Sequence, residues 1–351
     1  MNKENSYYSK RQNENTIRLR RVLKDLPKFC AEFFRGIDHN TSILTRVNYA
    51  YDLRLFFNYI TEDLEEFKGI SPTDLSIDDL NSITVTHIEM FLNFLTLYTN
   101  DDDIEYANRE SGKARKLSTL RSFFLYFHKK GSIDKNVASL VSLPKIHDKP
   151  IIRLEVDEIV ELLDMVDSGD GLTETQQRYH NYTRKRDLAI IMLLLGTGIR
   201  ISECVGLNMS DIDFDINGFM VTRKGGSETI LYFSEEVRKA LLDYIEERKE
   251  IDTLPGHEDA LLLSLQRRRI SVRAVQNLVK KYSKHVTPLK NISPHKLRST
   301  FGTNLYRETG DIYLVADVLG HEDVNTTKRH YAATSDEMRR QAARIVKLRD
   351  D

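Results

Sequence analysis

The chain has 351 residues, of which 40% are hydrophobic and 30% are charged, and its formal net charge at pH 7 is −1. At roughly 150 residues per domain this length predicts about two domains, and the composition excludes a disordered chain. The longest unbroken apolar run covers 188–195, which is far shorter than the roughly 20 residues of a membrane span. We therefore expect no membrane segment.

The cysteine content indicates a reducing compartment. Cys30 and Cys204 are the two cysteines, and they form no paired motif, which argues against a disulfide framework and a cysteine-ligated zinc site. The N-terminal residues lack the apolar stretch of a secretory signal. The acidic run 101–103 is interpreted as an exposed loop. We expect a cytoplasmic protein without a metal or a cofactor.

The charge is unevenly distributed along the chain. Residues 61–105 carry twelve acidic residues and one lysine, whereas residues 264–298 carry ten Lys and Arg and no acidic residue. A basic block of this kind is typical of phosphate binding, and the alternative is a solvated helical face.

Helical periodicity dominates the first part of the chain. Residues 42–60 place apolar side chains on one stripe, and residues 113–130 combine an apolar face with a basic outer surface. Thr86 and Glu89 form a capping-box pattern, which predicts a helix start between them.

These patterns predict two domains. We expect an N-terminal tail over 1–24 and a helical domain over 25–142. The stretch 143–150 contains two prolines and little to bury, which is typical of a linker. The second domain then covers 151–351.

The second domain is also predicted to be mostly helical. Residues 212–233 are the exception, because short β-type runs are broken there by Asn217-Gly218 and Gly225-Gly226, which are hairpin signals. The fold class is therefore mainly α with a small antiparallel β-sheet. Helix N-caps are predicted at Ser234, Ser271 and Ser293, the last followed by Pro294, and helix C-caps at Gly310 and Gly320.

Arg200 stands at an unusual place for a cation. It follows the turn Gly196-Thr197-Gly198 and lies between two apolar segments. An arginine in such surroundings needs an anionic partner. That partner is either a bound anion or a buried carboxylate, for which Glu203 and Asp187 are the candidates.

Further cationic groups follow along the chain. His295 and Arg298 are three residues apart just inside a capped helix, where they share a face near the helix N-terminus and make a good phosphate site. Lys224 lies beside the hairpin turn. His321 follows Gly320, and Tyr331 comes after it.

Four sequence words carry these residues in order: GTGIRISECVGL (196–207), VTRKGG (221–226), SPHKLRSTFGTNL (293–305) and LGHEDVNTTKRHY (319–331). In these words the chain resembles the catalytic domain of the tyrosine recombinases, the integrase and Xer family. A looser resemblance to the core-binding module of that family covers RKLSTLRSFFLYF at 115–127.

The resemblance implies a site-specific DNA recombinase that breaks and rejoins strands without a metal through a 3′-phosphotyrosyl link. Tyr331 is then the nucleophile, and Arg200 and Arg298 stabilise the transition state. His295 acts as the base and Lys224 as the general acid. His321 hydrogen-bonds a phosphate oxygen, and Glu203 supports Arg200.

The spacing of the nucleophile departs from the family. In most members the tyrosine follows the Gly-His histidine by nine residues, but that position is His330 here and Tyr331 is tenth. Tyr313 is the second candidate nucleophile. The shift also leaves open a DNA-binding protein of the same fold that has lost catalysis.

The resemblance also implies the partners: double-stranded DNA with inverted-repeat sites, and a homotetramer on two such sites joined through the helix at 335–348. The short stretch before the core-binding helices favours a Xer-like or mobile-element recombinase. The C-terminal helix at 335–348 argues against the alternative of a type IB topoisomerase. The expected DNA-contacting residues are Arg115, Lys116, Arg121, Arg267, Arg268, Arg269, Arg273, Lys280, Lys281 and Lys284.

Overall fold

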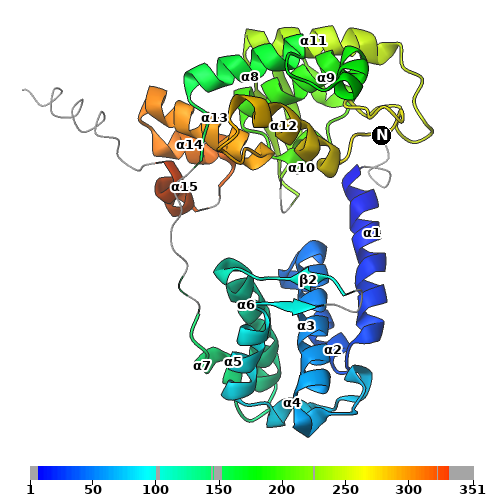
Figure 1. The fold of residues 1–351 in the computed structure, drawn as a ribbon, viewed down its shortest axis with the longest axis vertical. Helices are drawn as coiled ribbons and strands as arrows, with labels where there is room; N and C mark the ends of the chain where they lie inside the picture. Colours follow the sequence, from blue (N-terminus) through cyan, green and yellow to red (C-terminus); the bar gives the residue numbers. More distant parts are fainter. Residues whose placement is uncertain are drawn as a thin grey trace, which may run out of the picture. The chain divides into compact units, whose positions relative to one another are not determined.

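The computed structural model describes residues 7–99, 103–143, 145, 152–223, 226–321 and 323–331, without the side chains of 326 and 329–331. The chain divides into two compact units, Met1–Lys149 and Pro150–Asp351 (Figure 1). The division falls within the proline-containing stretch 143–150. Each unit is described by itself.

The first unit is built from helices and one small β-ladder. Its strands β1 (Tyr98–Thr99) and β2 (Glu105–Tyr106) pair in antiparallel fashion. Its helices are α1 (Tyr7–Val22), α2 (Cys30–Gly36), α3 (Ile43–Asp63), α4 (Ile77–Ser82), α5 (Val85–Phe94), α6 (Glu110–Lys129) and α7 (Val137–Leu140).

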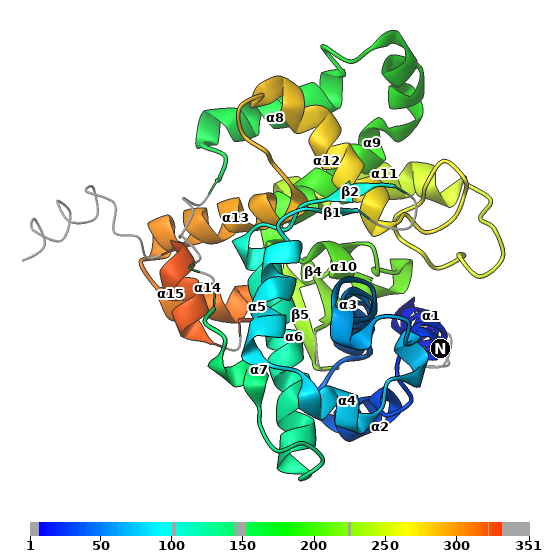
Figure 2. The same ribbon diagram turned by 60° about the horizontal axis from the view of Figure 1, so that its bottom comes forward.

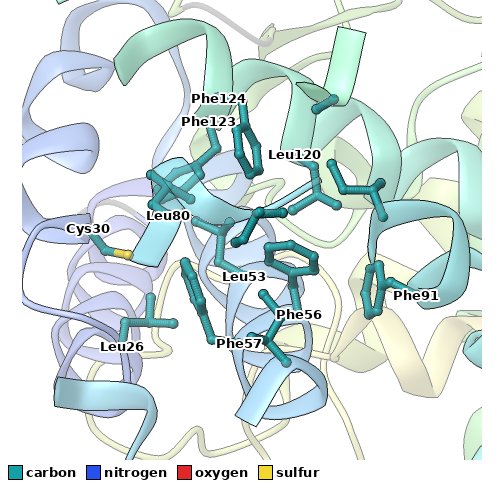
Figure 3. Close-up of a cluster of buried hydrophobic side chains, with 14 of the residues drawn as sticks. Leu26, Cys30, Leu53, Phe56, Phe57, Leu80, Phe91, Leu120, Phe123 and Phe124 are labelled. Carbon is teal, nitrogen blue, oxygen red and sulfur yellow. The ribbon is translucent and has the colours of Figure 1, made fainter. Parts of the chain in front are cut away.

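Aromatic side chains from α3, α5 and α6 form the centre of this unit (Figure 3). Phe56 meets Phe91 edge to face with ring centroids 5.1 Å apart, and Phe123 lies 5.9 Å from Phe57. Such pairs contribute about 0.5–1.5 kcal/mol beyond the burial of their area. The apolar stripes predicted over 42–60 and 113–130 therefore supply this core.

Two local predictions in this unit are wrong. The N-terminal tail expected over 1–24 contains helix α1, because Leu19 and Val22 are buried and α1 packs on α3. Helix α5 is capped by Thr84, whose side chain accepts from the amide of His87, and not by Thr86. Ile83 and Ile88 flank that cap and are both buried, so their burial selects the earlier threonine.

The second unit surrounds one long helix. Helix α9 (Glu174–Thr197) packs against α8 (Val156–Ser168), α11 (Glu235–Lys249) and α13 (Pro294–Thr309). Helices α13, α14 (Ile312–Leu319) and α15 (Val324–Tyr331) contact one another, as the orange to red part of Figure 1 shows. The remaining helices are α10 (Ile201–Cys204) and α12 (Val272–Val286).

A small antiparallel sheet completes this unit. Its strands β3 (Ile212–Asp213), β4 (Gly218–Thr222) and β5 (Glu228–Tyr232) follow the order β3-β4-β5, with Phe219 opposite Leu231. Strands β4 and β5 are visible in Figure 2. The predicted fold class, mainly α with a small antiparallel sheet, is confirmed.

The predicted helix ends in this unit are largely confirmed. Ser234 and Ser271 accept backbone hydrogen bonds as N-caps, and Gly310 and Gly320 end their helices at φ of 65° and 60°. Ser293 precedes α13 without a side-chain capping bond. Across the described ranges, no helix is both long and apolar enough to cross a membrane.

Candidate active site

The turn after α9 brings Arg200 out of an apolar helix. Gly198 ends α9 in the left-handed conformation, with φ of 62°. A Cβ atom at this glycine would overlap with the side chains of Phe301 and Leu319. The chain can therefore reverse there and approach α13 and α14 closely only because the residue is glycine.

Arg200 has two partners on opposite sides. Its Nη1 donates to Oε1 of Glu203 at 2.9 Å, and the same carboxylate accepts from the Arg200 amide at 3.0 Å. Its Nη2 donates to the carbonyl of Gly320 at 2.7 Å. The pair with the buried Glu203 carboxylate is thus present. Asp187 is not the partner, since it accepts from the Tyr282 hydroxyl and pairs with Arg186.

Arg298 lies beneath the same turn. It is 4% exposed, and its guanidinium donates to the carbonyls of Gly198 and Leu319. Two guanidiniums from distant parts of the chain therefore donate to adjacent carbonyls where α14 ends. A helix C-terminus carries a partial negative charge, which favours these cations.

His321 leads from this turn to the last described helix. It follows Gly320, and its Nδ1 lies 2.7 Å from Oγ1 of Thr327, which is buried in α15. Tyr331 is the final residue of α15 and comes one helical turn after Thr327. The side chains of His330 and Tyr331 lie outside the described part of the structure.

Of the two remaining predicted site residues, the structure describes one. His295 is exposed in the first turn of α13, one turn before Arg298. Lys224 lies outside the described residues. The sequence analysis did not identify Arg223, whose Nη2 donates to the carbonyl of Val318 at 2.9 Å. Its position directly before Lys224 is the signal that could have found it.

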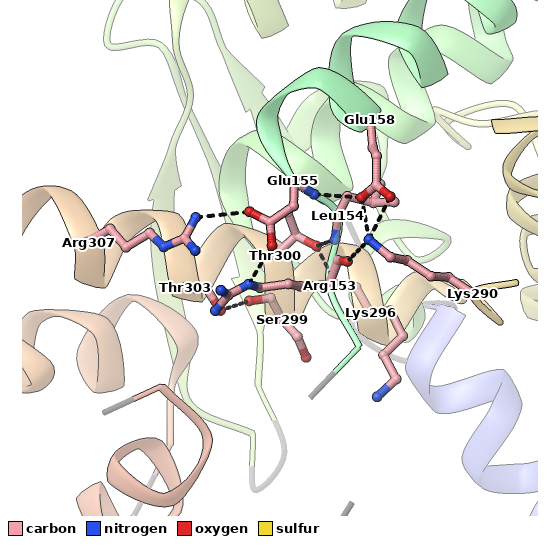
Figure 4. A network of polar contacts seen from close by, with 10 residues as sticks. All are labelled: Arg153, Leu154, Glu155, Glu158, Lys290, Lys296, Ser299, Thr300, Thr303 and Arg307. Atoms are coloured by element: carbon pink, nitrogen blue, oxygen red, sulfur yellow. Dashed lines mark hydrogen bonds and ion pairs between the residues drawn. The ribbon is translucent and has the colours of Figure 1, made fainter. Parts of the chain in front are cut away.

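The helix that carries His295 and Arg298 also contacts the start of the second unit, through the polar groups drawn in Figure 4. Oγ1 of Thr300 accepts the buried amide of Leu154 at 3.1 Å. Arg307 pairs with Glu155 at 3.3 Å. The buried contact of Thr300 fixes the middle of α13, and the pair of Arg307 lies at the surface near its C-terminal end.

The expected DNA-contacting residues of the first unit are engaged with protein groups. Lys116 was expected on the basic outer surface, but it is 8% exposed and donates to Asn108. Arg115 is exposed and donates to the buried carboxylate of Asp52, with Nη2 and Oδ1 2.6 Å apart. Arg121 donates to the carbonyls of residues 138 and 141. Surface placement is therefore wrong for Lys116, because its side chain is buried where it reaches the Asn108 amide.

The basic stretch 264–298 divides into two kinds of residue. Lys281 was expected to point outward, but its Nζ lies 3.3 Å from the nearly buried Asp187 carboxylate, so this expectation is wrong. Arg269 donates to the carbonyls of Val205 and Leu207. The exposed residues are Arg267, Arg268, Arg273, Lys280 and Lys284, and their contact with DNA stays a prediction.

The chemistry of the site follows from its donors. Arginine forks supply fixed positive charge in a geometry that matches phosphate oxygens, and a turn that immobilises two of them is pre-organised for an anion. Among the described residues, no group of three or more His, Cys, Asp and Glu could hold a metal ion.

Comparison with known proteins identifies the family. The model of the phage integrase family matches residues 153–338. Tyrosine recombinase XerC of Caldanaerobacter subterraneus subsp. tengcongensis is 35% identical over 292 residues, which cover 80% of this chain and 75% of the relative. Tyrosine recombinase XerC of Syntrophus aciditrophicus is 30% identical over 312 residues, which cover 86% and 91%.

Solved structures agree in fold. The XerH site-specific recombinase bound to a palindromic difH substrate covers 87% of this chain and 81% of its own, with a TM-score of 0.63 and 19% identity. The Tn1549 transposon integrase in complex with circular intermediate DNA covers 90% and 99%, with a TM-score of 0.63 and 20% identity. Because the family model spans more than half of the sequence, the chain belongs to the phage integrase family and is a tyrosine recombinase.

Proposed function

We propose that this chain is a Xer-like or mobile-element recombinase that cuts and rejoins DNA strands at a specific site through Tyr331. The observation that carries the proposal is the position of Arg200 and Arg298, whose guanidiniums donate to the adjacent carbonyls of Gly320 and Leu319. His321 comes next in the chain. An anion beside this turn therefore meets two guanidiniums and an imidazole.

Each group has one chemical task in the proposal. The phenolic oxygen of Tyr331 forms a bond to phosphorus while the bond from phosphorus to the 5′-oxygen breaks. His295 takes the phenolic proton, and Lys224 gives a proton to the departing 5′-oxygen. The charge that develops on the phosphate is stabilised by Arg200 and Arg298.

Glu203 and Thr327 support this arrangement through their hydrogen bonds. Glu203 fixes Arg200 through two hydrogen bonds. The contact between His321 and Thr327 joins the turn to the helix that ends at Tyr331, which supports Tyr331 as the nucleophile despite its spacing of ten residues.

The partners belong to the same proposal. We infer that the chain binds double-stranded DNA with inverted repeats and assembles as a homotetramer on two such sites. The neighbouring XerH structure holds its recombinase on a palindromic substrate, and the lambda integrase structure holds a tetramer on a Holliday junction. We also infer a cytoplasmic location. Both cysteines of the chain are buried free thiols, which agrees with a reducing compartment.

A nicked suicide duplex tests the activity. Its site is obtained by selecting bound duplexes from a pool with a randomised core, so no site has to be assumed. Wild type should form a covalent adduct on this duplex, because the released strand end diffuses away and prevents rejoining. Tyr331→Phe should bind the duplex equally and form no adduct, and Tyr313→Phe, as its matched control, should react as wild type does.

Two outcomes would contradict the proposal. If wild type binds the selected duplex and traps no adduct, the chain is a DNA-binding protein that has lost catalysis. If Tyr331→Phe still traps an adduct, another residue is the nucleophile, and mass spectrometry of the linked peptide identifies it.

A further inference from the structure

Arg223 joins two parts of the second unit that are far apart in the sequence. Its backbone closes the β4–β5 hairpin, since its amide donates to the carbonyl of Ser227 at 2.7 Å and its carbonyl accepts from Gly226 at 3.0 Å. Its side chain reaches the end of α14, where Nη2 donates to the carbonyl of Val318 at 2.9 Å. The residue therefore links the hairpin to the turn that precedes His321.

The three carbonyls at the end of α14 each accept from a different arginine. Val318 accepts from Arg223, and the carbonyls of residues 319 and 320 accept from Arg298 and Arg200. The guanidinium of Arg223 also lies directly against Gly320, because a Cβ atom added at that glycine would overlap with it. The glycine thus makes room for the arginine as well as for the turn.

The surroundings of this guanidinium set it apart from an ordinary surface arginine. Within the part of the chain that the structure describes, its Nη1 is fully buried and has no hydrogen-bond partner. Buried unpaired donors are rare in proteins, so this one calls for a physical explanation. Burial lowers the pKa of Arg223, while the carboxylate of Glu203 acts in the opposite direction and Arg200 lowers it further. The arginine thus lies close enough to Arg200 and Glu203 to interact with their charges.

We propose that Arg223 is a positioning residue for the general acid. The next residue in the chain is Lys224, so the contacts of Arg223 hold the residue to which Lys224 is bonded against the end of α14. The inference rests on the proposed function, in which Lys224 protonates the departing 5′-oxygen. Loss of Arg223 then impairs proton transfer to that oxygen and leaves the groups that bind the phosphate in place.

A change of leaving atom tests this role. Two suicide duplexes of the selected sequence are compared, one with the natural 5′-oxygen at the cleaved bond and one with sulfur in its place. A thiol is a much stronger acid than an alcohol, so the sulfur leaves as a thiolate without receiving a proton. General acid catalysis increases reaction rates by about 10²–10⁴-fold. Arg223→Gln should therefore cleave the oxygen substrate at least about tenfold more slowly than wild type in a single turnover.

On the sulfur substrate, Arg223→Gln should cleave within about threefold of wild type, because no general acid is needed there. Lys224→Gln should likewise cleave the sulfur substrate at close to the wild-type rate. Its slower cleavage of the oxygen substrate defines the full effect of losing the general acid. Arg248→Gln is the matched control, since Arg248 also donates to backbone carbonyls, those of residues 258 and 260, and lies away from Lys224 in the sequence. It should lower Tm and leave the ratio of the two cleavage rates unchanged.

The outcomes separate the two proposals. If wild type forms no adduct on either duplex, the proposed function is wrong and the role of Arg223 fails with it. If wild type and Lys224→Gln behave as expected but Arg223→Gln is slowed equally on both duplexes, or on neither, only the positioning role is overturned. An equal loss on both duplexes would instead assign Arg223 to phosphate binding or to folding.

Discussion

Arg200 and Arg298 donate through Nη2 to the adjacent carbonyls of Gly320 and Leu319, although they lie far apart in the sequence. The two arginines differ in their surroundings. The side chain of Arg200 is 32% exposed and pairs with Glu203, whereas Arg298 is 4% exposed. Each arginine is nevertheless bonded to buried groups, so both should contribute to cleavage and to stability.

Replacing either arginine with glutamine should slow single-turnover cleavage by about 10²–10³-fold, because each change removes a pre-organised donor to the phosphate. Arg298→Gln should also lower the free energy of unfolding, by about 1–3 kcal/mol, since it leaves two buried carbonyls unpaired. Arg200→Gln should lower it as well, because it leaves the buried Glu203 carboxylate without its cation. Arg307→Gln is the control, because its ion pair with Glu155 lies at the surface. Urea unfolding and rapid-quench cleavage check both expectations, and an unchanged free energy of unfolding in either variant would contradict them.

Gly320 and Gly310 provide a matched pair of helix ends. Both have a left-handed backbone, but nothing lies within 4 Å of a Cβ atom at Gly310, whereas a Cβ atom at Gly320 overlaps with Arg223. Gly310→Ala should cost about 1 kcal/mol of stability from the backbone alone and leave the cleavage rate unchanged.

Gly320→Ala should cost more stability and should also slow cleavage, because it displaces Arg223 and the turn to which Arg200 and Arg298 donate. Thermal unfolding and the suicide-duplex assay measure the two effects. Equal behaviour of the two alanine variants in both assays would show that the packing around residue 320 is unimportant for the site.

Substitutions of neighbouring lysines in α12 should change the salt dependence of DNA binding to different extents. Lys280 and Lys284 are exposed, whereas Lys281 pairs with Asp187. Each phosphate contact contributes about 0.9 to the slope of log affinity against log salt concentration. Lys280→Gln and Lys284→Gln should each reduce that slope by about 0.9 on the selected duplex.

Lys281→Gln should leave the slope unchanged and lower the stability of the second unit, since it removes a partner of a nearly buried carboxylate. Binding titrations over a series of salt concentrations measure the slope for each variant. A reduced slope for Lys281→Gln, with no change for the other two, would place the DNA on the opposite side of this helix.

The buried thiol of Cys204 should make stability depend on pH in the alkaline range. Its pKa is raised from 9.0 to about 12, first because burial disfavours the thiolate and second because Glu203 is close. Above pH 9 the unfolded chain loses this proton while the folded chain keeps it, so the free energy of unfolding falls as pH rises.

Between about pH 8 and about pH 10 this single group should cost about 1.4 kcal/mol. Cys204→Ala should abolish that part of the decrease, and the difference between the two proteins isolates it from other titrating groups. Urea unfolding at the two pH values measures it. The same decrease in wild type and in Cys204→Ala would show that the folded thiol titrates normally.

Much of this protein was determined by the sequence alone. Apolar spacing predicted the helices of both units, and the Asn-Gly and Gly-Gly pairs predicted the hairpin, because these features depend on local backbone geometry and on which face is buried. Four short words were enough to indicate the family. The order of Arg200, His295, Arg298, His321 and Tyr331 along the chain carried that inference.

Only the tertiary structure decided which cations are engaged within the protein. In the sequence, Lys116 and Lys281 cannot be told apart from their exposed neighbours. In the structure, Lys116 donates to Asn108 and Lys281 pairs with Asp187. The contact of Arg223 with the end of α14 could not be predicted from the sequence either. Long flexible side chains can reach partners on any neighbouring element, so their contacts depend on which elements pack together and not on local sequence.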